Sequence, residues 1–103
     1  MISQLRIYTV NRGMMDQWVK HFTEVVRPMM ESHGAEIGGM WVNEDNNQFI
    51  WIRSFAGSED AETKMAAWGA LSEWRAIRER VFSYLARLDT QIMTPVAKVA
   101  VSA

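Results

Sequence analysis

Leu5-Arg6-Ile7-Tyr8-Thr9-Val10 is followed by the polar turn Asn11-Arg12-Gly13 and by a long amphipathic segment that ends at Gly34. Side chains of a β-strand alternate between two faces, so Arg6 and Tyr8 would share one face, opposite Leu5 and Ile7. Gly13 suits the positive φ of a tight turn. The stretch therefore predicts a strand over about residues 3–10, a turn, and a helix over about residues 14–33.

The predicted helix is amphipathic. Its apolar stripe has spacings of three and four residues and consists of Met15, Trp18, Val19, Phe22, Val25, Val26, Met29 and Met30. Pro28 lies inside this pattern, where it removes one intrahelical hydrogen bond and crowds the preceding turn. We therefore expect a kink near residues 24–28 or two helical pieces, and a left-handed C-cap at Gly34.

The second half of the chain repeats the strand and helix pattern. Strands are predicted over residues 35–44, with a bulge at Gly38-Gly39, and over residues 49–55, and the turn residues Asp45-Asn46-Asn47 join them into an antiparallel hairpin. A helix capped by Ser58 is expected to reach about Trp68 and to be interrupted at Gly69.

A second helical piece is expected from about Ser72, with an apolar stripe that extends to Leu85 and Leu88. The last strand is then predicted over about residues 90–101. It must accommodate Pro95, which cannot donate a hydrogen bond to a neighbouring strand. The predicted order of elements is therefore β-α-β-β-α-β.

This order is that of the ferredoxin-like split βαβ unit, an α+β fold in which helices cover one face of a four-stranded antiparallel sheet. The third strand carries Trp51 and Phe55 on one face and Ile50 and Ile52 on the other. Because both faces are apolar, we expect a second copy to pack its sheet against the free face and form a homodimer. The length of 103 residues fits a single domain over residues 1–103.

Composition excludes several function classes. The net charge is −1 and the charges are dispersed, which argues against nucleic acid and anionic membranes as partners. The absence of cysteine excludes disulfides, thiol nucleophiles and thiolate metal sites, and is compatible with a reducing cytoplasm. No apolar run approaches the ~20 residues needed to span a bilayer. We therefore expect a cytoplasmic protein.

Eight methionines and five tryptophans are a large number for so short a chain. They could build a core and a dimer interface, or they could line a cavity for a small apolar ligand. Under the second interpretation, Trp18, Trp41 and Trp51 are candidate ligand-binding residues.

Polar candidates come from the strands and the first helix. If the first and third strands pair, Arg6, Tyr8 and Arg53 lie close together, and an arginine among aromatic rings can bind a carboxylate or polarise a carbonyl. The arginines could equally stack on Trp51 or pair with Glu36 or Glu44. With only two histidines, no cluster has the spacing of a metal site, and we expect neither metal nor cofactor.

His21 borders the apolar stripe of the first helix. It could face a cavity between helix and sheet and act as a general base, with Tyr8 as a second catalytic candidate. It could also be a partly buried histidine that is hydrogen-bonded to a neighbour.

The quoted residues also resemble a known family. The opening strand with its Arg and Tyr before Gly13, and Ile50-Trp51-Ile52-Arg53-Ser54-Phe55 as a third strand, are similar to NIPSNAP-family domains. His33-Gly34-Ala35 leading to Gly39-Met40-Trp41, and the tryptophan-containing pairs Ala67-Trp68 and Glu73-Trp74, extend the likeness over nearly the whole chain. The resemblance implies a dimeric α+β barrel, whereas the family has no settled chemistry.

Three functions remain open. The first is a homodimer that binds a small apolar or aromatic ligand between helices and sheet. The second is a cofactor-independent monooxygenase or isomerase, similar to the antibiotic-biosynthesis-type monooxygenases, with His21, Tyr8 and Trp41 at the site. The third is a structural or protein-interaction dimer with no ligand.

Overall fold

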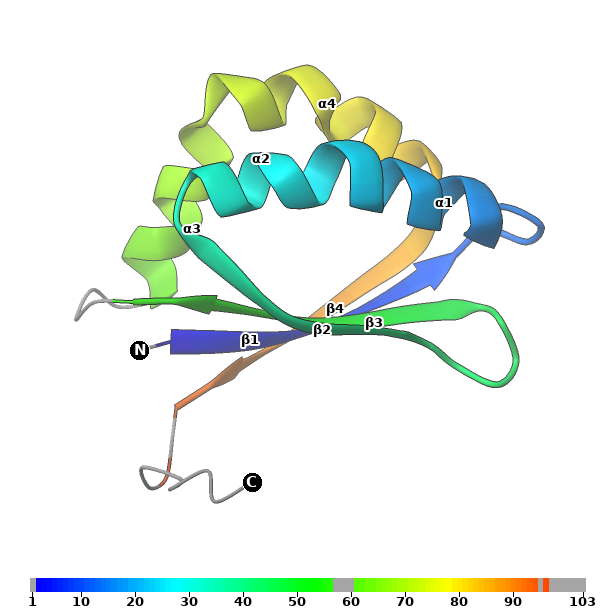
Figure 1. Ribbon diagram of the computed structural model, residues 1–103, viewed down its shortest axis with the longest axis horizontal. Coiled ribbons are helices and arrows are strands. Elements are labelled where there is room, and N and C mark those ends of the chain that lie inside the picture. The colour runs from blue at the N-terminus through cyan, green and yellow to red at the C-terminus, as the bar shows by residue number, and fades with distance from the viewer. Residues whose placement is uncertain (1, 57–60, 95, 97–103) are drawn as a thin grey trace.

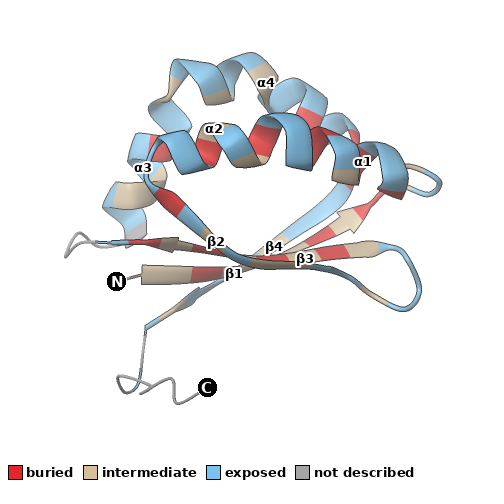
Figure 2. Cartoon of the chain, viewed as in Figure 1, coloured by how far each residue is buried: buried red, intermediate tan, exposed pale blue. Residues whose placement is uncertain are grey.

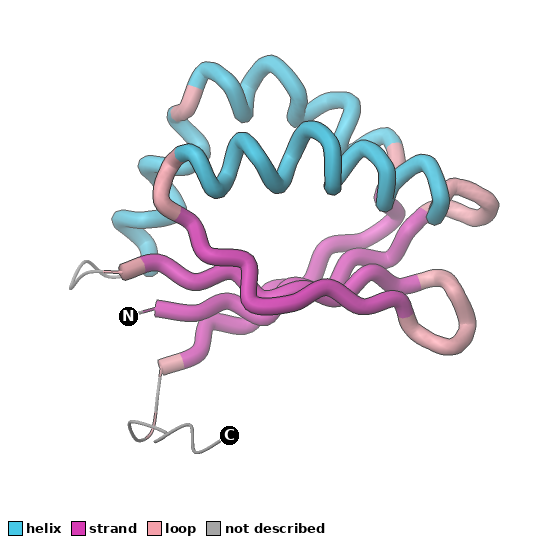
Figure 3. The backbone as a smooth tube through the Cα atoms, in the orientation of Figure 1, coloured by secondary structure: helices cyan, strands magenta, loops and turns pink. Residues whose placement is uncertain are grey.

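A computed structural model describes residues 2–56, 61–94 and 96. The elements are β1 (Ile2–Val10), α1 (Met15–His21), the π-helical turn η1 (Phe22–Val26), α2 (Arg27–Ser32), β2 (Ala35–Val42), β3 (Gln48–Phe55), α3 (Ala61–Ala70), α4 (Ser72–Ser83) and β4 (Leu85–Met93). The helices form one layer over one face of a twisted sheet (Figures 1 and 3). The predicted ferredoxin-like α+β fold is confirmed.

The sheet has the strand order β2-β3-β1-β4, and every neighbouring pair is antiparallel. In the pairing of β1 with β3, Gln4 lies opposite Arg53 and Arg6 lies opposite Trp51. The expected bulge in β2 occurs between Ile37 and Gly39. The register therefore brings the arginines of β1 and β3 to neighbouring positions, as the sequence predicts.

The irregularity expected before Pro28 is present as the π-helical turn between α1 and α2. The N–H of Arg27 donates to the carbonyl of Phe22, five residues back, instead of four. Pro28 occupies the first turn of α2, where its missing N–H costs little. The wider turn accommodates the proline ring while the two helices continue in nearly the same direction (Figure 1).

Two glycines occupy the left-handed conformation expected of them. Gly13 in the turn after β1 has φ of 80°, and Gly34 after α2 has φ of 88°. L-residues with a Cβ disfavour this region, so both turns depend on glycine.

The boundaries of the later elements differ from the sequence prediction. Gly69 lies inside α3, and the break falls at Leu71, whose extended backbone separates α3 from α4. Leu85 and Leu88 belong to β4 and not to the helix, because β4 pairs with β1 from Leu85 opposite Val10 onward. Leu85 and Leu88 are three residues apart, which fits the apolar stripe of a helix, but their pairing with β1 places them in a strand. The expected cap at Ser58, Pro95 and the end of the last strand lie outside the described residues.

The core lies between the helices and the sheet, where the buried residues gather (Figure 2). Its most deeply buried apolar residues are Trp18, Phe22, Val26, Phe49, Trp51 and Val81. The opposite face of the sheet, which we call the open face, presents the partly buried side chains of Leu5, Ile7, Ile50 and Ile52.

Candidate functional site

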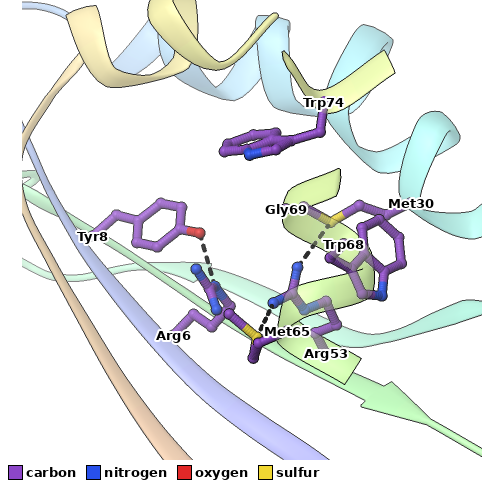
Figure 4. Close-up of a pocket in the computed structure, with 8 residues that line it drawn as sticks. All are labelled: Arg6, Tyr8, Met30, Arg53, Met65, Trp68, Gly69 and Trp74. Atoms are coloured by element: carbon purple, nitrogen blue, oxygen red, sulfur yellow. Dashed lines mark hydrogen bonds between the residues drawn. The ribbon is translucent and has the colours of Figure 1, made fainter. Parts of the chain in front are cut away.

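A cavity of about 100 Å³ lies between the sheet and the helices. Its lining residues come from β1, β3, α2, α3 and α4 and are Arg6, Tyr8, Met30, Arg53, Met65, Trp68, Gly69 and Trp74. Figure 4 shows the two guanidinium groups and the Tyr8 hydroxyl on the sheet side, with the rings of Trp68 and Trp74 on the helix side. We refer to this space as the arginine cavity.

Strand alternation places the charged groups of the cavity. Gln4, Arg6 and Tyr8 follow one another at every second position of β1, so all three face the helices, as does Arg53 on β3. Arg6 is 9% exposed and Arg53 is 3% exposed. Two cationic side chains are therefore buried side by side under the helices.

A network of hydrogen bonds holds the two guanidinium groups. Arg53 donates from Nε and Nη2 to Oε1 of Gln4 at 3.1 and 2.6 Å, and Arg6 donates from Nη1 to the same oxygen at 3.1 Å. Arg6 also donates from Nε to the hydroxyl of Tyr8 at 2.8 Å. One neutral amide oxygen thus positions both arginines.

Aromatic rings complete the surroundings of these groups. The Cζ atoms of Arg6 and Arg53 lie 5.5 and 5.6 Å from the ring centroid of the fully buried Trp51. Arg53 also lies 5.2 Å from the ring of Phe55 and 5.3 Å from that of Trp68. Cation–π attraction therefore stabilises both cations, as in one of the two alternatives that the sequence left open.

The other alternative, an ion pair with Glu36 or Glu44, is not found. In the part of the chain that the structure describes, neither Arg6 nor Arg53 contacts a carboxylate. Burial lowers the pKa of Arg53 to about 9, the nearby charge of Arg6 adds to this effect, and Tyr8 opposes it. The arginine cavity therefore carries positive charge that no described residue neutralises.

His21 lies apart from this cavity. It packs on α1 against Trp18 and Tyr84, with ring centroids 6.4 and 5.6 Å away, and lines a shallow hollow with Lys20, Arg80 and others. Burial, and then the charge of Arg80, lower its pKa. Its Nε2 atom is buried and has no hydrogen-bond partner among the described residues. His21 is thus not brought together with Arg6 and Arg53.

The candidate tryptophans are separated as well. Trp51 lies beneath both arginines, whereas Trp18 is buried in the core among Tyr8, Phe22, Phe49 and Tyr84. Trp41 is 52% exposed and lies opposite Ile50 on the open face. Neither Trp18 nor Trp41 lines the arginine cavity.

Sequence reasoning did not single out Gln4, Met30, Met65, Trp68 and Trp74 as site residues. Gln4 could have been found from the sequence, because it lies two positions before Arg6 on the same strand face. Met30 belongs to the predicted apolar stripe of the first helix, whereas the positions of Met65, Trp68 and Trp74 could not be foreseen, since they depend on how α3 and α4 pack.

The described residues offer neither a cluster of metal ligands nor a membrane-spanning helix. No group of three or more His, Cys, Asp or Glu side chains in residues 2–56, 61–94 and 96 is arranged to hold a metal ion. Among the same residues, no helix is both long and apolar enough to cross a membrane.

Fold and site together define a ferredoxin-like α+β domain with a positively charged, aromatic-walled cavity beneath its helices. The chain belongs to the NIPSNAP family, whose model matches residues 3–99. No curated protein matches the chain.

Solved structures share the fold at low sequence identity. A NIPSNAP domain protein from Burkholderia xenovorans is 17% identical, with a TM-score of 0.80 and coverage of 95% of this chain and 97% of its own. A NIPSNAP family protein from Agrobacterium tumefaciens is 19% identical, with a TM-score of 0.80 and 97% of both chains covered. An antibiotic biosynthesis monooxygenase is 10% identical, with a TM-score of 0.72, covering 94% of this chain and all (100%) of its own.

Proposed function

We propose that this chain binds a small molecule with an apolar or aromatic body in the arginine cavity. The observation that carries the proposal is the cavity itself, where thioether and indole side chains face the polar groups of β1 and β3. Binding sites for small molecules usually combine apolar walls with a few polar groups that fix the orientation of the ligand. Arg6, Tyr8 and Arg53 supply such groups here.

A thermal-shift screen of small aromatic and acyl compounds tests this proposal. A ligand present at ten times its Kd stabilises the folded state by about 1.4 kcal/mol, which raises the Tm of a domain of this size by about 5–10 °C. Trp74→Ala, which removes one wall of the cavity, should reduce the shift. Trp41→Ala, on the open face, should leave the shift intact. A flat response across a broad library would contradict the proposal.

We further propose that the protein is a homodimer in which a second copy covers the open face. Support comes from the apolar side chains of β1 and β3 there, together with the half-exposed Trp41. Small sheets with two apolar faces bury both in known folds. Such a dimer would leave the arginine cavities on its two outer, helical sides.

A cofactor-independent oxygenase or isomerase is a second candidate, favoured by the fold shared with an antibiotic biosynthesis monooxygenase. This chemistry needs a base beside the substrate. Tyr8 lines the cavity and His21 does not, so Tyr8 is the residue that we assign to this role. Oxygen consumption with a bound compound, lost in Tyr8→Phe, would favour the enzyme. A binding protein would consume none.

The third candidate is a structural or protein-interaction dimer with no ligand. It predicts that no compound raises the Tm, and that Trp74→Ala and Trp41→Ala differ only in their effects on stability. The screen described above therefore separates it from the first proposal.

A further inference from the structure

Some N–H groups of the two arginines donate to strong acceptors, whereas others have a weak acceptor or none. Arg6 uses Nε and Nη1 in hydrogen bonds, and its Nη2 has no partner among the described residues. Arg53 directs Nη1 toward Sδ of Met30 at 3.9 Å and Nη2 toward Sδ of Met65 at 3.3 Å. Thioether sulfur is a weak acceptor. Several guanidinium donors at the cavity therefore meet a weak acceptor or none (Figure 4).

The charge of the pair is also uncompensated. Both cations share the neutral oxygen of Gln4, and no carboxylate of a described residue reaches either of them. Burying a charge is costly unless an opposite charge or strong hydrogen bonds accompany it. An anion placed between Arg6 and Arg53 would satisfy the free donors and neutralise part of the charge at once.

The remaining walls restrict what the anion can be. Trp68, Trp74, Met30 and Met65 offer apolar surface, which suits a hydrocarbon or aromatic body. A cavity of about 150 Å³ holds benzene, so about 100 Å³ holds the charged head and only part of such a body. Phosphate also accepts hydrogen bonds from arginine but carries no apolar body for these walls, so it serves as a separate anion in the test.

We infer that the ligand of the arginine cavity is a carboxylic acid, bound as its carboxylate by Arg6 and Arg53, with its apolar or aromatic body against Trp68 and Trp74. This inference rests on the proposed ligand-binding function and names the chemical class of the ligand. Planar, forked donors match the two oxygens of a carboxylate and give charge-assisted hydrogen bonds stronger than those of neutral groups.

Matched acid and amide probes test the inference on the unmodified protein. Calorimetric titrations would compare benzoate with benzamide and butanoate with butanamide, with inorganic phosphate as a separate arm. Each amide keeps the shape and the carbonyl of its acid but carries no charge. We expect at least one acid to bind, its amide to bind at least tenfold more weakly, and phosphate to bind more weakly than that acid.

Variants then locate the binding. Arg6→Met and Arg53→Met keep an unbranched apolar side chain but remove the guanidinium, and each should weaken binding of the acid at least tenfold. Arg87→Met is the matched control, because Arg87 is an exposed arginine of β4 paired with Asp89. It should leave the affinity for the acid unchanged. Circular dichroism verifies that each variant is folded.

The outcomes separate the inference from the proposed function. Equal binding of acid and amide would overturn the carboxylate inference and leave ligand binding standing. Preference for phosphate would overturn it in favour of a different anion. Failure of all these probes, while neutral compounds still raise the Tm, would also overturn it. Failure of the probes together with a flat thermal-shift screen would overturn both.

Discussion

Arg53 is a buried cation held by an amide oxygen and three aromatic rings. Its surroundings could be foreseen only in part from the sequence. Alternation along β1 and β3 predicts that Arg6, Tyr8 and Arg53 lie together near Trp51, because register depends on local pattern. The partners contributed by α3 could not be foreseen, since helix packing depends on contacts far apart in the chain. The same limit explains why His21, which borders the predicted apolar stripe, lies in a separate hollow.

His21 makes the stability of the protein depend on pH. Because burial and Arg80 lower its pKa in the folded state, the unfolded chain binds more protons than the folded one as the pH falls through about 6.5. Stability contributed by His21 is therefore present above that pH and decreases below it. Urea unfolding between pH 8 and pH 5.5 should show a steeper loss of stability for the unmodified protein than for His21→Gln. The same dependence of the free energy of unfolding on pH in both proteins would contradict a role for His21 in it.

Local sequence signals predict some boundaries of the helices and strands correctly. Other boundaries are determined by contacts between elements, such as strand pairing. At Pro28 the expected interruption of the helix takes the form of a π-helical turn, and at Gly34 the helix ends as expected. Gly69, in contrast, is tolerated within α3, and Leu85 joins β4 because β1 offers it a pairing partner. A helical stripe and the start of a strand are indistinguishable over so few residues.

Two glycine substitutions test this account of the elements. Gly34→Ala places a Cβ in the left-handed region, and we expect it to destabilise the fold by about 1–2 kcal/mol. Gly69→Ala places a Cβ in an α-helix where no atom lies within 4 Å, and we expect it to stabilise the fold by about 0.5–1 kcal/mol. Equilibrium unfolding in urea measures both changes. Equal changes in the free energy of unfolding would contradict the claim that position 34 requires glycine and position 69 does not.

The whole molecule has one covered and one uncovered sheet face, and the NIPSNAP family and its ferredoxin-like fold were foreseen from the sequence. The family name supplies no reaction. Function must therefore be argued from the arginine cavity, and assembly from the open face.

Assembly can be tested by charge placed on each face of the sheet. We expect the protein to have a solution mass of about twice the 11.9 kDa of one chain. Ile50→Lys, on the open face, should shift it to one chain mass, because a lysine would be buried between the sheets. Ile92→Lys is the control, since Ile92 is 56% exposed and lies opposite Gln4 on the helical face. Light scattering that gives a single chain mass for the unmodified protein would rule out the dimer.

The most direct measurement of the central claim is a ¹H–¹⁵N spectrum of the arginine Nε groups, recorded as the tighter-binding acid of the two, benzoate or butanoate, is added. Signals of Arg6 and Arg53, assigned from their methionine variants, should move as the acid is added, while that of Arg87 should not. The matching amide should move them little. Shifts confined to exposed arginines, with those of Arg6 and Arg53 unchanged at saturating concentrations of both acids, would contradict the account.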